Sequence, residues 1–252
     1  MLAQALPLFR ASGKMMLRSR GVVFAVAAGS LQVAVFGLMR NLRFGFGGHE
    51  IGFFDFALPG MAVFLAIYQL QDIMVAVAAN YRARGILRRL AVTPVWPPLV
   101  IAIQITTYVG VGVVAAAVVL TVGTLIGGDL AMTPRLLWLI PLIGMAVLTS
   151  LAIAFAVAGL TPNPQTASNV GQTISFLLFA FTGTFLPVQA LPGALPHIVP
   201  YAVPHTALIQ AIRGIALTGA NITQYATQVV VGVGWLAASL LVASLAYRFT
   251  DE

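Results

Sequence analysis

Residues 136–160 read LLWLIPLIGMAVLTSLAIAFAVAGL, a long apolar run that contains no Asp, Glu, Lys or Arg. A helix needs about 20 mostly apolar residues to cross the hydrocarbon core of a bilayer. A transmembrane β-strand would instead alternate in hydrophobicity over about ten residues. Because the run is continuously apolar for longer than that, it predicts a membrane-spanning helix.

The composition of the whole chain supports the same class of protein. Of its 252 residues, 60% are hydrophobic and only 8% are charged, whereas soluble domains average about 45–50% apolar and about 25% charged residues. So few charges cannot cover a soluble surface, and a disordered chain would be poor in apolar residues. The chain has no cysteine, which excludes disulfides, thiol catalysis and thiolate metal sites.

Further apolar runs give six predicted spans in an all-α, polytopic membrane fold that occupies residues 1–252 as a single transmembrane domain. The first run is longer than the apolar region of a signal peptide, which has about 7–15 residues, so we expect it to be retained. The predicted spans are residues 21–39, 56–79, 98–126, 136–160, 169–186 and 225–247.

Residues 187–213 are apolar enough to suggest a seventh span, but prolines interrupt them. Each proline inside a helix removes a hydrogen bond and costs about 3 kcal/mol. We therefore expect a broken segment at the outer interface, partly re-entrant into the bundle, before the last span. The prolines are Pro187, Pro192, Pro196, Pro200 and Pro204.

The positive charges predict the orientation, because cytoplasmic loops are enriched in Lys and Arg. With six spans, most of the 13 Lys and Arg residues lie on the side of both termini, which we therefore expect to be cytoplasmic. That side holds Arg10, Lys14, Arg18, Arg20, Arg82, Arg84, Arg88, Arg89 and Arg248, and the other side holds Arg40, Arg43, Arg135 and Arg213. The net charge of +7 then indicates lipid headgroups rather than nucleic acid as the partner. The bias toward Ala, Val, Gly and Arg hints at a bacterium, and so at its inner membrane.

Residues 1–19 place Arg10, Lys14 and Arg18 four residues apart among apolar side chains. This pattern predicts a helix that lies in the cytoplasmic interface. The alternative is a basic leader that only follows the positive-inside rule.

Residues 80–94, NYRARGILRRLAVTP, follow the second predicted span. Ile86, Leu87 and Leu90 would form one apolar face of a short helix, which ends before Pro94 because the residue before a proline avoids helical angles. Such a basic amphipathic helix either docks into a groove on a cytoplasmic partner or rests on headgroups.

The second distinctive segment contains FTGTFLP at residues 181–187, LPGALP at residues 191–196, and Arg213 further on. By itself it reads as an irregular outer cap. Together, the two segments resemble those of permease subunits of ABC transporters of the type-2 exporter family, closest to the daunorubicin-resistance type. Matching residues in the first segment are Arg84, Gly85, Leu87, Arg89, Leu90, Thr93 and Pro94, and in the second Gly183, Phe185, Pro187, Leu191, Pro192, Pro204 and Arg213. Many relatives carry an acidic residue within positions 80–84, where this chain has Arg82 and Arg84.

The resemblance implies a permease subunit that has no catalytic site of its own. Two permease chains, identical or paralogous, would form the pathway, and two separate ATP-binding subunits would hold ATP and Mg. Residues 80–94 would be the coupling helix that seats in those subunits, with Arg82, Arg88 and the matching residues above as its contacts. The chain has no phosphate-binding loop of its own, and we expect it to bind no cofactor.

Asp72 is the only acidic residue deep inside a predicted span. Such a charge costs about 2.5–3.5 kcal/mol on insertion scales, so it normally faces the bundle interior. Gln69 and Gln104 are the expected neighbours in a polar cluster. Asp72 is then either a pathway or gating residue, part of a structural hydrogen bond between the second and third spans, or a residue near the inner interface.

Phe176, Phe179, Phe181 and Phe185 are concentrated in the fifth predicted span and provide candidate pathway surfaces, although lipid contact explains any single ring equally well. His49, His197 and His205 fall in predicted outer segments without metal-ligand spacing, so we expect no metal site and interpret them as interfacial or capping residues.

The function favoured by the sequence is therefore ATP-driven export of a hydrophobic or amphipathic small molecule, such as a drug, an antibiotic or a lipid. Polysaccharide or glycolipid export is an alternative, because relatives that move these share the layout. A secondary transporter or channel would place several ionisable residues at the midplane and often show internal repeats. A membrane anchor for a cytoplasmic complex is a third class.

Overall fold

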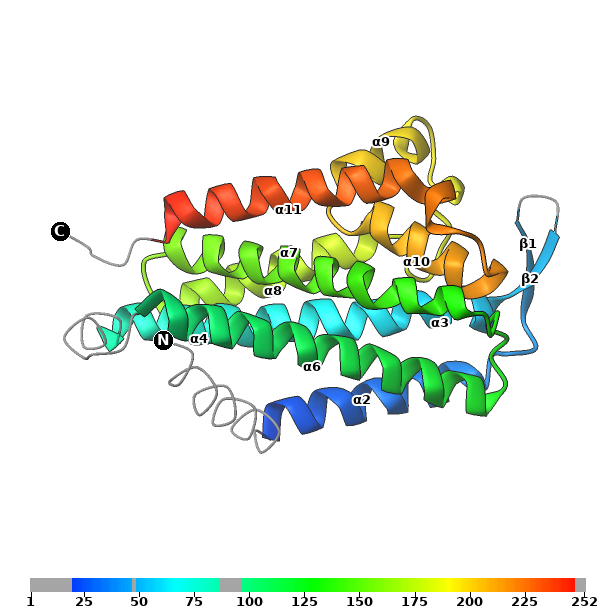
Figure 1. The fold of residues 1–252 in the computed structure, drawn as a ribbon, viewed down its shortest axis with the longest axis horizontal. Helices are drawn as coiled ribbons and strands as arrows, with labels where there is room; N and C mark the ends of the chain where they lie inside the picture. The colour runs from blue at the N-terminus through cyan, green and yellow to red at the C-terminus, as the bar shows by residue number, and fades with distance from the viewer. Residues whose placement is uncertain (1–19, 47–48, 87–96, 248–252) are drawn as a thin grey trace.

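The computed structural model describes residues 20–46, 49–86 and 97–247, and these form a bundle of long helices that run side by side (Figure 1). The helices are α2 (Arg20–Gly37), α3 (Phe53–Phe64), α4 (Leu70–Ala83), α6 (Pro97–Ile126), α7 (Leu139–Leu160), α8 (Pro164–Phe181), α9 (Leu195–Ala202), α10 (Thr206–Thr218) and α11 (Ala226–Ala246). Shorter turns are the π-helical η1 (Leu65–Gln69) and the 3₁₀ turns η2 (Pro134–Trp138), η3 (Val188–Ala190) and η4 (Ile222–Tyr225).

Four helical stretches of the described chain are long and apolar enough to cross a membrane: Phe53–Ala83, Ile101–Ile126, Pro134–Leu160 and Ile222–Ala246. The expectation of an all-α, multi-pass membrane protein is thereby confirmed. The first and fifth predicted spans correspond to α2 and α8, each 18 residues long. At 1.5 Å per residue they are about 27 Å long, slightly less than the hydrocarbon core. The total of six spans stays a prediction.

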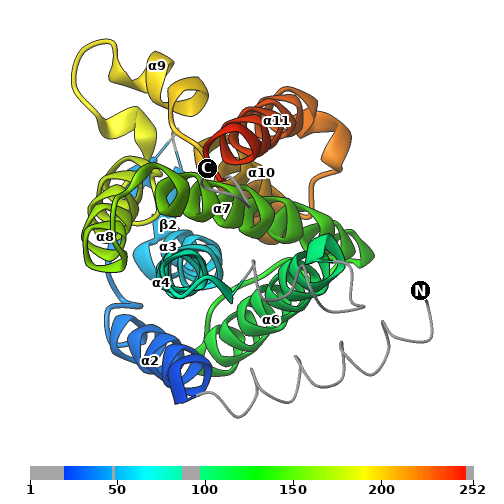
Figure 2. The same ribbon diagram turned by 90° about the vertical axis from the view of Figure 1, so that its left-hand side faces the viewer.

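The stretch Phe53–Ala83 forms the centre of the bundle. Figure 2 shows α3 and α4 nearly end-on, with α2, α6, α7 and α8 around them. Of an 18-residue apolar segment within this stretch, 71% is buried inside the bundle, against 17% of the corresponding segment of Ile222–Ala246. The predicted second span, residues 56–79, lies within this helical stretch, which extends beyond it at both ends. Its helix is also interrupted by η1, a feature that often marks functional positions in membrane and soluble helices.

The fifth predicted span, residues 169–186, is displaced from the helix that forms. Asn163 caps the start of α8 by accepting a hydrogen bond from the Thr166 amide at 2.8 Å. The helix ends at Phe181, and Gly183 follows with a φ of 73°, a conformation that glycine adopts without steric cost. The chain therefore turns within the residues that we expected to be helical.

The segment predicted at residues 187–213 contains two helices, α9 and α10, that break at Val203–His205. α10 continues past Arg213 to Thr218, and its Leu208, Ile209 and Ile212 are almost completely buried. α10 contacts α3, α7 and α11, so this half of the segment belongs to the packed bundle rather than to an outer cap.

A two-stranded hairpin joins α2 to α3, which the sequence did not predict. β1 (Arg43–Phe46) pairs antiparallel with β2 (His49–Gly52), and Arg43 lies opposite Gly52. The hairpin projects at the end of the bundle that also carries α9 and α10 (Figure 1). We call this the outer end, and we call the opposite end, where α4, α7 and α11 finish, the cytoplasmic end, following the predicted orientation. Residues 1–19, the predicted interfacial helix, lie outside the described residues.

Candidate transport pathway and coupling site

One face of α8 is polar and exposed over the cytoplasmic half of the helix. Its positions are about four and seven residues apart, the spacing that places side chains on one side of a helix. The exposed residues are Gln165, Asn169, Gln172 and Thr173, continued toward the outer end by Phe176 and Leu177. We call this set the α8 stripe. Gln165 Nε2 donates to Asn169 Oδ1 at 3.2 Å, and the Thr173 hydroxyl donates to the Asn169 carbonyl at 2.9 Å. The amide of Gln172 has no hydrogen bond within the described residues, and hydrocarbon offers amide groups no partner, so the stripe suits contact with water or with another protein surface.

The opposite face of α8 packs against the central helix. Ala167, Gly171 and Ser175 are buried, and a Cβ atom on Gly171 would lie 3.0 Å from Val75 Cγ2. Small residues let helix backbones approach closely in membrane bundles. The close packing fixes which side of α8 is turned outward, and therefore where the stripe lies.

Asp72 is joined to α8 through Ser175. The Ser175 hydroxyl donates to Asp72 Oδ1 at 2.8 Å and accepts from Gln71 Nε2 at 2.9 Å. Gln71 is fully buried, and its Oε1 has no hydrogen-bond partner in the described structure. Asp72 is half-buried beside it. These three residues, which we call the polar triad, connect the interior of the bundle with the helix that carries the stripe.

Of the predicted cluster of Asp72 with Gln69 and Gln104, the contact between Asp72 and Gln104 does not form within the described residues. Asp72 instead meets the fifth span, because α4 packs directly on α8 as well as on α7. Gln104 is half-buried on α6, and within the described residues it makes no hydrogen bond to Asp72. The side chain of Gln69 lies outside the described residues.

The four phenylalanines of the fifth predicted span divide into two groups. Phe176 and Phe181 are 69% and 39% exposed. Phe179 and Phe185 turn inward, and their ring centroids are 5.4 Å apart. The Phe179 ring also lies 4.5 Å from the Phe64 ring, and the Phe185 ring lies 4.9 Å from the Phe36 ring, between centroids. Phe179 and Phe185 therefore connect α8 and its following turn to α3 and α2, and only Phe176 belongs to the exposed stripe.

Arg213 holds the outer end together. Its Nε donates to the Phe56 carbonyl at 2.9 Å, and its second terminal nitrogen donates to Gly183 O at 2.8 Å and Thr184 O at 3.1 Å. The guanidinium also lies 3.7 Å from the centroid of the Phe56 ring. A cation over an aromatic face is attracted by the ring quadrupole. Arg213 thus fastens α10 to the start of α3 and to the turn after α8.

The prolines of the outer motif have different surroundings. Pro187 and Pro204 are buried, whereas Pro192 is exposed. Pro204 precedes His205, which is 2% exposed and has a left-handed φ of 73°. Of the two predicted roles, interfacial or capping, the buried His205 has the second by position, because it is the N-cap residue of α10, although its side chain makes no capping hydrogen bond. Its Nε2 lies 3.1 Å from the Ser150 hydroxyl on α7, because the break between α9 and α10 turns the ring into the bundle.

The predicted coupling segment begins at a defined helix end. Gly85 has a φ of 60° and follows α4, the left-handed conformation that commonly terminates helices. Arg84 is exposed, but Arg82 turns back and donates to the carbonyls of Ala158, Gly159 and Thr161 at 2.7–3.2 Å. Arg82 therefore caps the end of α7, and its predicted contact with an ATP-binding subunit stays a prediction. Leu87, Arg88, Arg89, Leu90, Thr93 and Pro94 lie outside the described residues.

The end of α11 joins the same cytoplasmic contact. The Tyr247 hydroxyl donates to the Ala78 carbonyl at 3.0 Å, and its ring meets Phe155 edge-on at a centroid distance of 5.1 Å. α7 and α11 approach so closely here that a Cβ on Gly159 would lie 2.5 Å from the Ala246 carbonyl oxygen. A displacement at the end of α4 would consequently act on α7 and α11 together.

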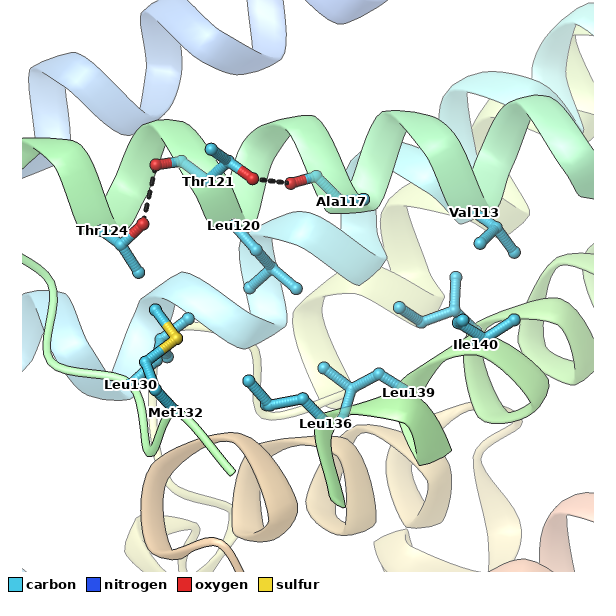
Figure 3. Close-up of a pocket in the computed structure, with 11 residues that line it drawn as sticks. Val113, Ala117, Leu120, Thr121, Thr124, Leu130, Met132, Leu136, Leu139 and Ile140 are labelled. Atoms are coloured by element: carbon cyan, nitrogen blue, oxygen red, sulfur yellow. Dashed lines mark hydrogen bonds between the residues drawn. The ribbon is translucent and has the colours of Figure 1, made fainter. Parts of the chain in front are cut away.

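An apolar groove of about 240 Å³ lies between the outer parts of α6 and α7 (Figure 3). The hydroxyls of Thr121 and Thr124 on its wall donate to the carbonyls of Ala117 and Thr121 at 2.8 Å. The polar atoms drawn there are thus satisfied within α6. In Figure 2 the central helix separates α6 from α8, so the groove and the stripe lie on different sides of the molecule. The groove suits contact with lipid hydrocarbon.

Sequence reasoning identified Phe176 but missed Gln71, Ser175 and the polar residues of the α8 stripe. The spacing of polar residues at 165, 169, 172 and 173 is a usable signal, because such a pattern is unusual in a helix surrounded by lipid. The hydrogen bonds of the polar triad had no sequence signal, since they depend on which two helices become neighbours.

Comparison with protein families matches residues 8–217 to the model described as ABC-2 type transporter. The match covers most of the chain, which therefore belongs to this family. Membership implies the permease subunit of an ABC exporter, with an ABC ATP-binding protein as its partner. No curated protein matches the chain.

Proposed function

We propose that this permease moves a hydrophobic or amphipathic small molecule out of the cell, along a pathway between two permease chains that the α8 stripe lines. The stripe is the observation that carries the proposal, because exposed amides beside an aromatic ring offer both kinds of contact that an amphipathic solute needs. A second permease chain facing the stripe would also remove these amides from lipid.

Energy enters from the cytoplasmic end in this proposal. Two ATP-binding subunits hold ATP and Mg, and they dock on residues 80–94, with Arg84 among the exposed contacts. Arg82 binds the end of α7, and Tyr247 binds α4. A movement of the coupling segment is thereby passed to α4, α7 and α11, and from α4 to α8 through the polar triad. The chain itself performs no catalysis.

The test is a complex of this permease with its ATP-binding partner, reconstituted in proteoliposomes. Asn169→Leu and Gln172→Leu together remove the middle of the stripe, whereas Val118→Leu on α6 is a matched control on an exposed apolar face. We expect transport of an amphipathic dye to require ATP hydrolysis, to fall strongly in the stripe variant and to persist in the control. Transport that continues without ATP hydrolysis would refute the proposal.

The role of the stripe is tested by the same assay. A stripe variant that assembles with its partner and transports at the wild-type rate would place the pathway elsewhere. Cysteines introduced at positions 169 and 173, in a chain that has none of its own, should react with a water-soluble thiol reagent when the pathway opens.

A further inference from the structure

A second pocket lies at the outer end, between α9, α10 and the start of α11. Its volume is about 270 Å³, and its polar lining consists of Gln189, His197, Tyr201, Gln210, Thr227 and Gln228. These residues come from four separate segments between η3 and α11. The pocket is distinct from the α8 stripe and from the apolar groove, with which it shares no residue.

The lining is polar but carries no Asp, Glu, Lys or Arg. A phosphate or carboxylate ligand would call for Arg or Lys, and no such residue lines the pocket. Each carboxamide instead offers two donors and one acceptor, and the hydroxyls of Tyr201 and Thr227 can both donate and accept. This combination matches a neutral ligand rich in hydroxyl groups, since every hydroxyl also both donates and accepts.

The three amides are available for such a ligand. Within the described residues, the side chains of Gln189, Gln210 and Gln228 make no hydrogen bond to the protein. Gln210 is half-buried on α10, where polar groups normally find a partner. Its neighbours Ile209 and Ile212 are fully packed in the core, so the backbone that carries the amide is held in place by the bundle.

α9 adds flat surfaces to one wall. Pro200 and Tyr201 line the pocket from this helix, and Trp235 on α11 donates to the Tyr201 carbonyl at 2.9 Å. That bond joins α9 to α11. Tyrosine combines an apolar ring with a polar tip, which suits a ligand with both C–H and O–H surfaces.

We propose that this pocket binds one sugar ring, as the uncharged head of an amphiphile. The volume of about 270 Å³ is slightly below the roughly 300–1,000 Å³ of sites for drug-sized ligands, so it fits a ring rather than a whole amphiphile. The part of the inference that concerns the exported substrate, namely that it carries a sugar, rests on the proposed function. The binding of the sugar does not depend on that function.

The experiment uses the full chain in phosphatidylcholine nanodiscs without ATP, and detects ligands by saturation-transfer NMR. The probes are methyl β-D-glucoside and, as a charged comparison, phosphocholine. The variant Gln210→Leu with Gln228→Leu should bind the glucoside about tenfold more weakly, the loss expected from two hydrogen bonds. Gln224→Leu is the matched control, because Gln224 is exposed, lies four residues before Gln228 and does not line the pocket.

Tyr201→Ala provides a second variant that keeps the bundle intact, because Tyr201 is 59% exposed. It should also weaken the glucoside signal. A double variant that unfolds at the wild-type temperature and retains full glucoside binding would overturn the inference, as would equal binding of phosphocholine. Glucoside binding without ATP-dependent transport would refute the proposed function alone, and transport without glucoside binding would refute this inference alone.

Discussion

Two arginines fasten the two ends of the bundle, and they do so differently. Arg82 at the cytoplasmic end donates to carbonyls at the end of α7. Arg213 at the outer end binds carbonyls after α8 and at the start of α3, and its guanidinium also lies over the Phe56 ring. Arg82 places positive charge at the C-terminus of α7, where the helix dipole favours it, whereas Arg213 lies between the turn after α8 and the first turn of α3. Arg82 lies within the predicted coupling segment, residues 80–94, which we expect to move. Arg213 instead joins α10, α3 and the turn after α8, which pack against one another.

The comparison indicates that arginines in this protein serve as helix caps as well as topology signals. Arg40 donates to the Ile126 carbonyl at 3.3 Å at the end of α6, and Arg135 donates to the Gly219 carbonyl at 2.6 Å after α10. Three of the four basic residues on the predicted outer side, Arg40, Arg135 and Arg213, thus have structural roles. The basic residues on the outer side are therefore explained by their contacts within the fold, and they do not weaken the orientation that the charge excess on the other side predicts.

The largest effect should follow from breaking the outer fastening with Arg213→Ala. Three carbonyls lose a charged donor, which should lower the free energy of unfolding by about 2–4 kcal/mol. Thermal unfolding in nanodiscs measures this loss. Arg213→Lys is the control and should restore part of it, because an ammonium cannot reproduce the planar guanidinium fork. Unchanged unfolding of the Ala variant would show that the outer end is held by apolar packing.

The cytoplasmic fastening should affect coupling more than stability. Arg82→Ala should leave the ATP-binding partner attached but lower transport per ATP by about tenfold, within the 1–3 kcal/mol typical of coupling between sites. Copurification and the ratio of transport to ATP hydrolysis measure the two quantities. Arg84→Ala, at an exposed neighbour, should instead weaken attachment. Identical behaviour of the two variants would contradict the different roles given to them.

Asp72 lies between the contacts made by Arg82 and Arg213. Its substitution should have a smaller effect, which falls on export and not on assembly. Asp72→Asn keeps an oxygen that accepts from Ser175 but removes the charge, so we expect reduced export with normal assembly. Ser175→Ala is the companion variant, because it removes the hydrogen bond and keeps the carboxylate. Size-exclusion chromatography and dye efflux are the measurements. Wild-type efflux from assembled Asp72→Asn complexes would leave Asp72 a structural role only.

The smallest effect should come from Tyr247→Phe. This change removes the hydrogen bond to the Ala78 carbonyl but retains the ring that packs on Phe155. We expect a loss of about 0.5–1.5 kcal/mol in unfolding free energy, measured by thermal unfolding. Phe155→Leu tests the ring contact separately. A loss from Tyr247→Phe as large as that from Arg213→Ala would mean that the two ends are held with equal strength.

Much of the fold was predictable because bilayer hydrocarbon imposes a simple rule on the sequence. Residues 136–160 and 98–126 had to be helices, and their bounds nearly coincide with those of α7 and α6. The start of α8 and the extent of α10 were not predictable by the same rule. Capping by Asn163 and the burial of Ile209 and Ile212 depend on local hydrogen bonds and on neighbours that hydropathy does not report.

The sequence by itself therefore determined the class of protein, the apolar helices and the motif that identifies the family, because these depend on composition and on spacing along the chain. Only the tertiary structure decided that Asp72 meets Ser175, that Arg82 caps α7 and that three glutamines surround one pocket. Those pairings follow from which helix faces become neighbours. In a membrane this choice is made by close packing and hydrogen bonds rather than by hydrophobicity, since the lipid is as apolar as the helices.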